Sequence, residues 1–186
     1  MKPIILAVLA LLAGSRTALA ELTVQQQHQA RQLADVSVQI TDLGESAKQM
    51  LQKNPRMAQA GKKDTACLLR YADTRGFYRY QLERAEQYVA ARPAAHIAQD
   101  LAVLDSETVT VLHQLATGGQ TDDTLLRKNR VLRHLMLLAT DRTYGALAEL
   151  LNLPQTGDDQ ASKLRAGKDM GDRYWSWIQA QCQKQN

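Results

Sequence analysis

Proline and cysteine are scarce in this chain, and long apolar runs are missing after its first twenty residues. The 186 residues include only 4 Pro and 2 Cys, with 10 Gly. A collagen-like or low-complexity chain is therefore excluded, because such chains contain far more Pro and Gly. No C-x-x-C pair occurs, which excludes a thioredoxin-like redox motif. Since 45% of the residues are hydrophobic, the chain can bury a core, and its length suits one globular domain.

The first twenty residues contain the three parts of an export signal in the right order. Met1–Pro3 carries a positive charge, Ile4–Ala13 is unbroken and apolar, and Ala18–Ala20 has the small-x-small pattern that a signal peptidase cleaves. The apolar run is about half as long as a membrane-spanning helix, so a membrane anchor is the weaker interpretation. We therefore expect cleavage after Ala20, one domain over residues 21–186, no membrane span after cleavage, and a periplasmic or secreted protein.

The charge of the chain gives no support to nucleic-acid binding. The formal net charge is +4, with 23 basic and 19 acidic residues. Lys2 and Arg16 precede the expected cleavage site and no acidic residue does, so the exported part is nearly neutral. A nearly neutral domain lacks the positive field that nucleic-acid binding needs, and we expect no nucleic-acid partner.

Cys67 and Cys182 are the two cysteines of the chain. An oxidising compartment favours a disulfide between them, and two separate buried thiols are the alternative. A cross-link that closes so long a loop contributes about 4–5 kcal/mol in the chain-entropy model. We expect the disulfide.

Apolar residues recur at helical spacing along almost the whole chain. Leu33, Val36 and Ile40, for example, are separated by steps of three and four and share one helix face. Caps and breakers divide the chain into expected helices at about 24–53, 64–91, 93–117, 122–153 and 158–182. Leu132 and Met136 continue the buried face of the fourth helix. We therefore expect an all-α, antiparallel up-and-down bundle of four or five long helices with one disulfide, in which both cysteines lie at the same end.

Local motifs for catalysis or cofactor binding are missing from the sequence. There is no G-x-S-x-G, no H-E-x-x-H, no glycine-rich phosphate loop and no C-x-x-C-H. His96 alone among the four histidines has an acidic residue one turn away, Asp100. A metal site needs three or four ligands, so we expect an exposed His96–Asp100 ion pair, no metal and no cofactor. A haem held by Met and His remains an open alternative, and catalytic residues on separate helices would leave no local motif.

Aromatic residues are concentrated in the second expected helix, which contains Tyr71, Phe77, Tyr78, Tyr80 and Tyr88. Arg75 lies one turn from Tyr71 and about one turn from Tyr78 on the expected buried face. An arginine between two phenols would hold a carboxylate-bearing small ligand or an acidic partner side chain. Alternatively, Arg75 pairs with a core acid or extends to solvent along the tyrosine rings. The three residues are the candidate ligand-binding site.

A basic cluster in the fourth expected helix is a candidate for partner binding. Arg127, Arg130 and His134 follow one another in steps of three and four and therefore share a face. Such a face would meet an anionic surface or an acidic protein. The alternative is an ordinary solvated face.

The last expected helix contains both tryptophans. Trp175 and Trp177 point about 200° apart on a helix, and Trp175 fits the buried face. Trp177 is the candidate for an exposed binding hot spot, with packing beneath the connection at 54–63 as the alternative.

The hypothesis that best accommodates these features is an exported helical-bundle protein that acts through protein–protein interaction in the cell envelope. Inhibitors, immunity proteins, adaptors and chaperones are examples. The hypothesis rests on the missing catalytic motifs and on side chains suited to interfaces. The alternatives are a sensor or enzyme for a small anionic ligand, with a pocket in the bundle core around Arg75, and a structural part of an envelope assembly.

Overall fold

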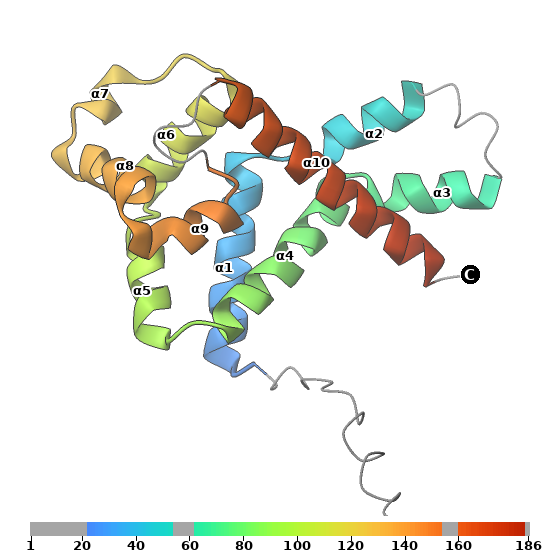
Figure 1. Cartoon of the computed structure of the whole chain (residues 1–186), viewed down its shortest axis with the longest axis horizontal. Coiled ribbons are helices and arrows are strands. Elements are labelled where there is room, and N and C mark those ends of the chain that lie inside the picture. Colours follow the sequence, from blue (N-terminus) through green and yellow to red (C-terminus); the bar gives the residue numbers. More distant parts are fainter. Residues whose placement is uncertain (1–21, 54–61, 154–159, 185–186) are drawn as a thin grey trace, which may run out of the picture.

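The computed structural model describes residues 22–53, 62–153 and 160–184, and within these ranges the chain is all-α (Figure 1). They form ten α-helices, one short 3-10 helix and no strand. The all-α prediction is confirmed. The expected export signal lies outside the described residues, and none of the described helices is both long and apolar enough to cross a bilayer.

The helices are shorter and more numerous than the five expected. They are α1 (Val24–Ile40), α2 (Gly44–Lys53), α3 (Lys62–Tyr71), α4 (Thr74–Ala90), α5 (Ala94–Ala102), α6 (Ser106–Thr117), α7 (Asp123–Leu126), α8 (Asn129–Thr140), the 3-10 helix η2 (Arg142–Tyr144), α9 (Gly145–Leu150) and α10 (Gln160–Gln183). Four of the five expected helices are therefore interrupted, and only the last, α10, is continuous.

An aspartate begins a new helical segment at four of these interruptions. In each case its side chain accepts a hydrogen bond from a backbone N–H in the next segment: Asp42 from Gly44 at 2.8 Å, Asp73 from Gly76 at 2.7 Å, Asp105 from Thr108 at 3.0 Å, and Asp141 from Thr143 at 2.8 Å. Such capping satisfies N–H groups that have no partner within the helix. The apolar spacing continues across these sites, which is why spacing alone predicts single long helices.

The antiparallel helices α1 and α4 connect two hydrophobic clusters. Gln26 at the start of α1 donates to the carbonyl of Val89 at the end of α4, 3.5 Å away. One cluster gathers α1, α5, α6, α8 and α9 around the second half of α4. The other gathers α2, α3 and α10 around its first half. Because the single helix α4 runs through both, the clusters form one continuous structure (Figure 1).

Two interhelical turns, 41–43 and 72–73, meet at what we call the helix junction. A Cβ atom on Gly44 would lie 2.2 Å from the carbonyl carbon of Asp73, and one on Gly76 would lie 1.9 Å from the Tyr71 oxygen. Both positions therefore require glycine. Thr74 Oγ1 adds a 2.6 Å hydrogen bond to Asp42 Oδ2 across the junction.

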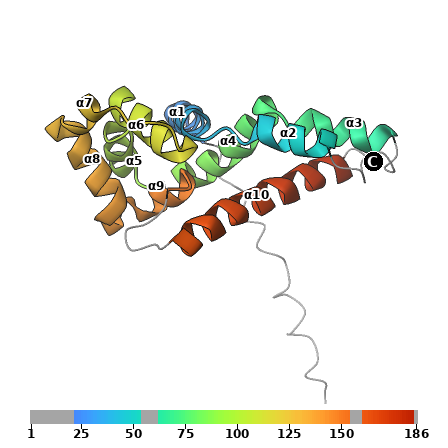
Figure 2. The same ribbon diagram turned by 90° about the horizontal axis from the view of Figure 1, so that it is seen from above.

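Helix α10 lies across one face of the layer that contains α2, α3 and α4 (Figure 2). It packs mainly against α3 and α4. A disulfide between Cys67 of α3 and Cys182 of α10 fixes its C-terminal end, with 5.8 Å between the two Cα atoms and a separation of 115 positions in the sequence. The predicted disulfide is confirmed.

Asp100 is buried at the corner between α4 and α5 and does not pair with His96. Its Oδ2 accepts a 2.5 Å hydrogen bond from the Tyr88 hydroxyl and lies 3.2 Å from Arg92 Nε. Burial, together with this hydrogen bond to Asp100, raises the pKa of Tyr88, so its hydroxyl stays protonated and donates. His96, one turn earlier on α5, is exposed. The expected exposed His96–Asp100 pair is therefore wrong, because Asp100 faces partners on α4 and the following turn.

We expect Asp100→Ala to lower the free energy of unfolding by about 3 kcal/mol, because it leaves Arg92 without its buried counter-charge. His96→Ala, on the same helix, is the matched control and should change the free energy by less than about 0.5 kcal/mol. Urea denaturation followed by circular dichroism measures both. Equal losses for the two variants would contradict the assigned pairing.

Candidate functional site

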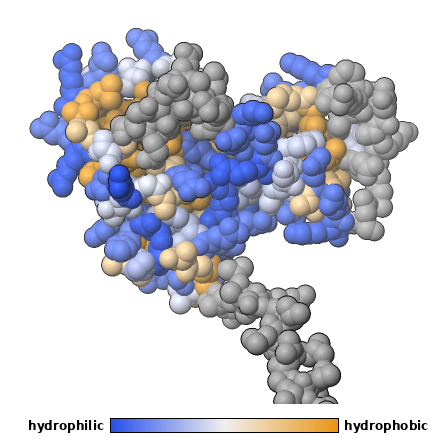
Figure 3. Space-filling model, viewed as in Figure 1, coloured by the Kyte–Doolittle hydropathy of each residue, from blue (hydrophilic) through white to orange (hydrophobic). Residues whose placement is uncertain are grey.

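Apolar surface gathers in two places in Figure 3, over the α6–α8 side of the molecule and beside α2, with hydrophilic surface between them. Each place has a hollow. The larger one, here called the α2–α10 groove, has a volume of about 710 Å³. It is lined by Leu43, Ser46, Ala47, Met50, Leu51, Leu68, Gly167, Lys168, Gly171, Asp172, Tyr174, Trp175 and Ile178. A hollow of this size and apolar character is typical of binding sites.

The α10 wall of this groove has no side chain at two positions, because both are glycines. Gly167 and Gly171 lie one turn apart, and a Cβ atom added to either would meet no neighbouring atom of the described residues within 4 Å. Neither has a positive φ angle. A glycine inside a helix lowers stability by about 0.5–1 kcal/mol relative to alanine. Since nothing in the described part of the chain requires these glycines, they leave the α10 backbone accessible to another molecule.

The rim of the α2–α10 groove combines a flexible apolar side chain with charges of both signs. Met50 is 67% exposed at the α2 edge. Lys168 and Asp172 lie on the α10 edge, and neither side chain forms an ion pair within the part of the chain that the structure describes. Methionine adapts to differently shaped partners and is common on protein-binding surfaces.

An aromatic cluster holds α10 in place next to the groove and consists of Tyr71, Phe77, Tyr80, Tyr174 and Trp177. The Tyr174 ring meets the Phe77 ring edge-on at 5.1 Å between centroids. Its hydroxyl donates to the Tyr71 carbonyl at 2.6 Å. Burial and the nearby carboxylates of Asp73 and Asp42 raise the pKa of Tyr174, so this donor keeps its proton.

Both tryptophans are partly buried and pack against the hydrophobic cluster of α2, α3, α4 and α10. Trp177 belongs to the aromatic cluster, and its Nε1 donates to Glu83 Oε2 at 2.7 Å. It therefore holds α10 against α4, while part of its side chain is exposed. Trp175 is partly buried and lines the α2–α10 groove. The expected alternative for Trp177, packing beneath 54–63, involves a connection of which residues 54–61 lie outside the described part.

The structure does not bring Arg75, Tyr71 and Tyr78 together. Arg75 is exposed and lines a shallow depression between α1 and α4 with Tyr78, Asp35 and Arg79. Tyr71 is buried in the aromatic cluster. The one-turn spacing to Tyr71 fails because α3 ends at Tyr71 and α4 starts at Thr74, so Tyr71 does not share a helix with Arg75 and Tyr78. Partial burial, with the Asp35 carboxylate nearby, raises the pKa of Tyr78.

The basic cluster is divided between the end of α7 and a network of ion pairs that joins α8 to the start of α6. Arg127 is the exposed C-cap residue of α7. On α8, Arg130 lies 3.3 Å from Asp105 and 2.8 Å from Glu107, and His134 Nδ1 lies 3.1 Å from Asp105. Lys128 also pairs with Glu107. Arg130 and His134 therefore bind α8 to the start of α6, and the expected common face of the three residues does not exist.

Thr108, His134 and Asp105 resemble a catalytic triad in composition but not in geometry. Thr108 Oγ1 lies 3.3 Å from His134 Nδ1, the same ring nitrogen that faces Asp105. A catalytic histidine needs one nitrogen for each neighbour. Thr108 is also fully buried, so this trio is structural.

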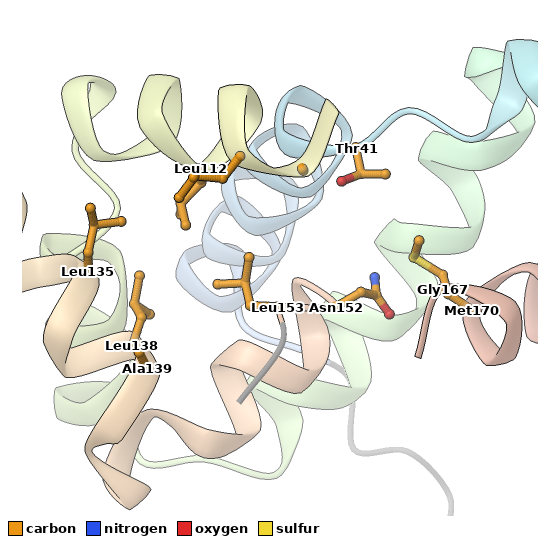
Figure 4. A pocket seen from close by; sticks show the side chains of 11 residues that line it. Thr41, Leu112, Leu135, Leu138, Ala139, Asn152, Leu153, Gly167 and Met170 are labelled. Atoms are coloured by element: carbon orange, nitrogen blue, oxygen red, sulfur yellow. The ribbon is translucent and has the colours of Figure 1, made fainter. Parts of the chain in front are cut away.

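The second hollow, here called the α6–α8 hollow, has a volume of about 460 Å³. Figure 4 shows Leu112, Leu135, Leu138 and Leu153 along it, with Thr41, Asn152 and Met170 at one end. It shares Gly167 with the α2–α10 groove. Sequence reasoning missed both hollows. The sequence contained one signal for them. Gly167 and Gly171 lie one turn apart inside an expected helix, where glycine has no role in capping.

The comparisons and the remaining side chains identify no known type of site. Within the described ranges, no group of three or more His, Cys, Asp or Glu side chains is placed to hold a metal ion. Comparisons of the chain with protein-family models, curated proteins and solved structures give no match.

The α6–α8 ion-pair network makes stability depend on acidic pH. Burial alone raises the pKa of Asp105, but the Thr108 N–H and the charges of Arg130 and His134 lower it by more. Hydrogen bonds from Lys128 and Arg130 lower the pKa of Glu107. A carboxyl group with a lowered pKa in the folded state stabilises the fold above its ordinary pKa and loses this contribution as the pH falls.

We therefore expect the melting temperature to be steady near neutral pH and to fall below about pH 4, where unfolded Asp and Glu begin to take up protons. Arg130→Ala should melt lower than wild type at pH 7 and lose less on acidification. Thermal melts at several pH values provide the test. Equal losses on acidification in both proteins would show that the network has no role in this dependence.

Proposed function

We propose that this chain is an exported binding protein that acts through protein–protein interaction, and that its partner presents an amphipathic helix to the α2–α10 groove. The observation that carries the proposal is an apolar groove whose α10 wall is bare at Gly167 and Gly171. Binding of an amphipathic helix in a hydrophobic groove is a recurring mode of peptide recognition.

Small residues on both walls favour a helix as the occupant. Ser46 and Ala47 lie on the α2 side, opposite Gly167 and Gly171 on the α10 side. Small side chains one turn apart let two helix backbones approach closely, as they do where helices pack in membranes. The exposed side chain of Met50 can then cover the docked helix.

Charges on the rim favour a partner helix with polar flanks of both signs. Lys168 and Asp172 are available on the α10 edge, and Glu45 and Lys48 form a 3.7 Å pair on α2. Charges at the edge of an interface contribute more to specificity and association rate than to affinity. An acidic partner residue next to Lys168 and a basic one next to Asp172 would fix the direction of the helix.

Export is the second part of the proposal and rests on the pattern of residues 1–20. The Cys67–Cys182 disulfide is compatible with an extracellular or exported protein. A partner in the cell envelope or outside the cell follows from this location. An inhibitor, immunity protein, adaptor or chaperone would each use such a groove. The alternative of an anionic ligand around Arg75 has less support, because Arg75 is exposed and Tyr71 lies elsewhere.

Site-specific photo-cross-linking in cells tests the proposal. A photoreactive amino acid in place of Met50 should give a protein adduct, because Met50 is exposed at the groove rim. The same amino acid in place of Val24, which is 83% exposed on α1, is the matched position outside the groove. The Met50 adduct should fall at least about tenfold when Gly171→Leu fills the groove, since loss of a buried anchor contact is worth 1.4 kcal/mol or more.

Gly145→Leu is the control substitution, because a side chain at Gly145 also meets open space but lies at the start of α9. It should leave the adduct unchanged. An equally strong adduct at Val24, no adduct at Met50, or a Met50 adduct that survives Gly171→Leu would each contradict the proposal.

A further inference from the structure

The α6–α8 hollow is built for a different occupant from a protein helix. Its walls are mostly apolar side chains from α6, α8, α10 and the turn after α9, including Leu112, Leu135 and Met170 (Figure 4). About 460 Å³ lies within the range of small-molecule sites. Water fills such a space poorly, because each buried water needs two to four polar partners. An apolar molecule is the better occupant.

None of the described residues that line the α6–α8 hollow is charged. The described lining residues are aliphatic, apart from Gly167, Met170 and the two uncharged polar residues Thr41 and Asn152. A carboxylate or an ammonium group inside it would lose hydration without gaining a counter-charge, at a large free-energy penalty. The occupant is therefore neutral.

The two polar side chains lie at one end of the hollow in Figure 4, away from Leu135 and Leu138. Thr41 is the C-cap residue of α1, and its hydroxyl makes no hydrogen bond within the described part of the chain. Asn152 has a left-handed backbone with φ of 56°. This conformation is uncommon for residues other than glycine, although asparagine tolerates it best.

Arg84 determines which side of the Asn152 amide faces the ligand. Its Nη1 lies 3.5 Å from Asn152 Oδ1, and its Nη2 donates to the Glu149 carbonyl at 2.9 Å. The accepting oxygen of the amide therefore faces the guanidinium. One N–H of Asn152 Nδ2 is directed to the Leu150 carbonyl at 3.4 Å, and the second remains for a ligand. The polar end of the hollow thus offers an N–H donor and a hydroxyl.

We infer that the α6–α8 hollow binds a neutral small molecule with an apolar chain and one carbonyl group, such as a ketone, ester, lactone or amide. The carbonyl oxygen accepts hydrogen bonds from the Asn152 amide and the Thr41 hydroxyl, and the chain lies along Leu112, Leu135 and Leu138. This site and its chemistry are independent of the proposed partner helix, since the α2–α10 groove has other walls apart from Gly167.

A set of ligands of matched chain length tests the inference on the purified, disulfide-bonded protein. The neutral fluorescent probe N-phenylnaphthylamine is bound first and then displaced by methyl octyl ketone, decane or decanoate. We expect the ketone to displace the probe best and decanoate to bind at least about tenfold more weakly, because its charge must be desolvated. Failure of the ketone to displace the probe, or equal displacement by decanoate, overturns the inference.

Substitutions then locate the binding. Thr41→Val keeps the shape of the side chain and should weaken ketone binding about 2- to 10-fold, with no change for decane, since it removes one hydrogen bond. Ala116→Trp fills the hollow from its exposed edge and should abolish probe binding. Ala139→Leu fills it from α8 and is the second variant, with circular dichroism to check folding.

Gly171→Leu is the control that separates this site from the α2–α10 groove. It blocks only the groove and should leave ketone affinity unchanged. Loss of ketone binding with Gly171→Leu but not with Ala116→Trp would overturn the inference. It would leave the proposed partner helix standing, because the Met50 cross-link tests that proposal separately.

Discussion

The close approach of Gly44 to the Asp73 peptide group is the constraint on which the rest of the structure depends. It brings the turn between α1 and α2 against the turn between α3 and α4. Gly76 against the Tyr71 carbonyl completes the contact. The Tyr174 hydroxyl then donates to that same carbonyl and docks α10 on the junction. The two hydrophobic clusters and the groove between α2 and α10 all follow from this arrangement.

Helix α10 is held mainly through its C-terminal half, and its preceding turns form a wall that other molecules can reach. Tyr174, Trp177 and the Cys67–Cys182 disulfide bind the C-terminal half to α3 and α4. Before Tyr174, Gly167 and Gly171 meet none of the described side chains. The glycines of this chain therefore serve two purposes: those at the junction allow close packing within the chain, and those in α10 leave room for a partner.

The helical class and the disulfide could be predicted because helical spacing and a single cysteine pair are local or countable features. The helix breaks could not, since the apolar spacing continues across the capping aspartates. Leu132 and Met136, expected to be buried, are 46% and 57% exposed, because α8 restarts at Asn129 and buries Val131 and Leu138 instead. The partners of Asp100, Trp177 and Arg130 lie on other elements, where spacing along one helix carries no information. The two hollows depend on such contacts between helices as well.

Replacing glycines by alanine and measuring the free energy of unfolding in guanidinium chloride tests the central claim most directly, namely that the α10 glycines serve binding and not folding. Gly44→Ala should lower this free energy by about 2 kcal/mol or more, because the new methyl group collides with the Asp73 peptide. Gly171→Ala should raise it by about 0.5–1 kcal/mol, because alanine favours the helix and meets open space. A loss of stability in Gly171→Ala comparable to that in Gly44→Ala would contradict the claim.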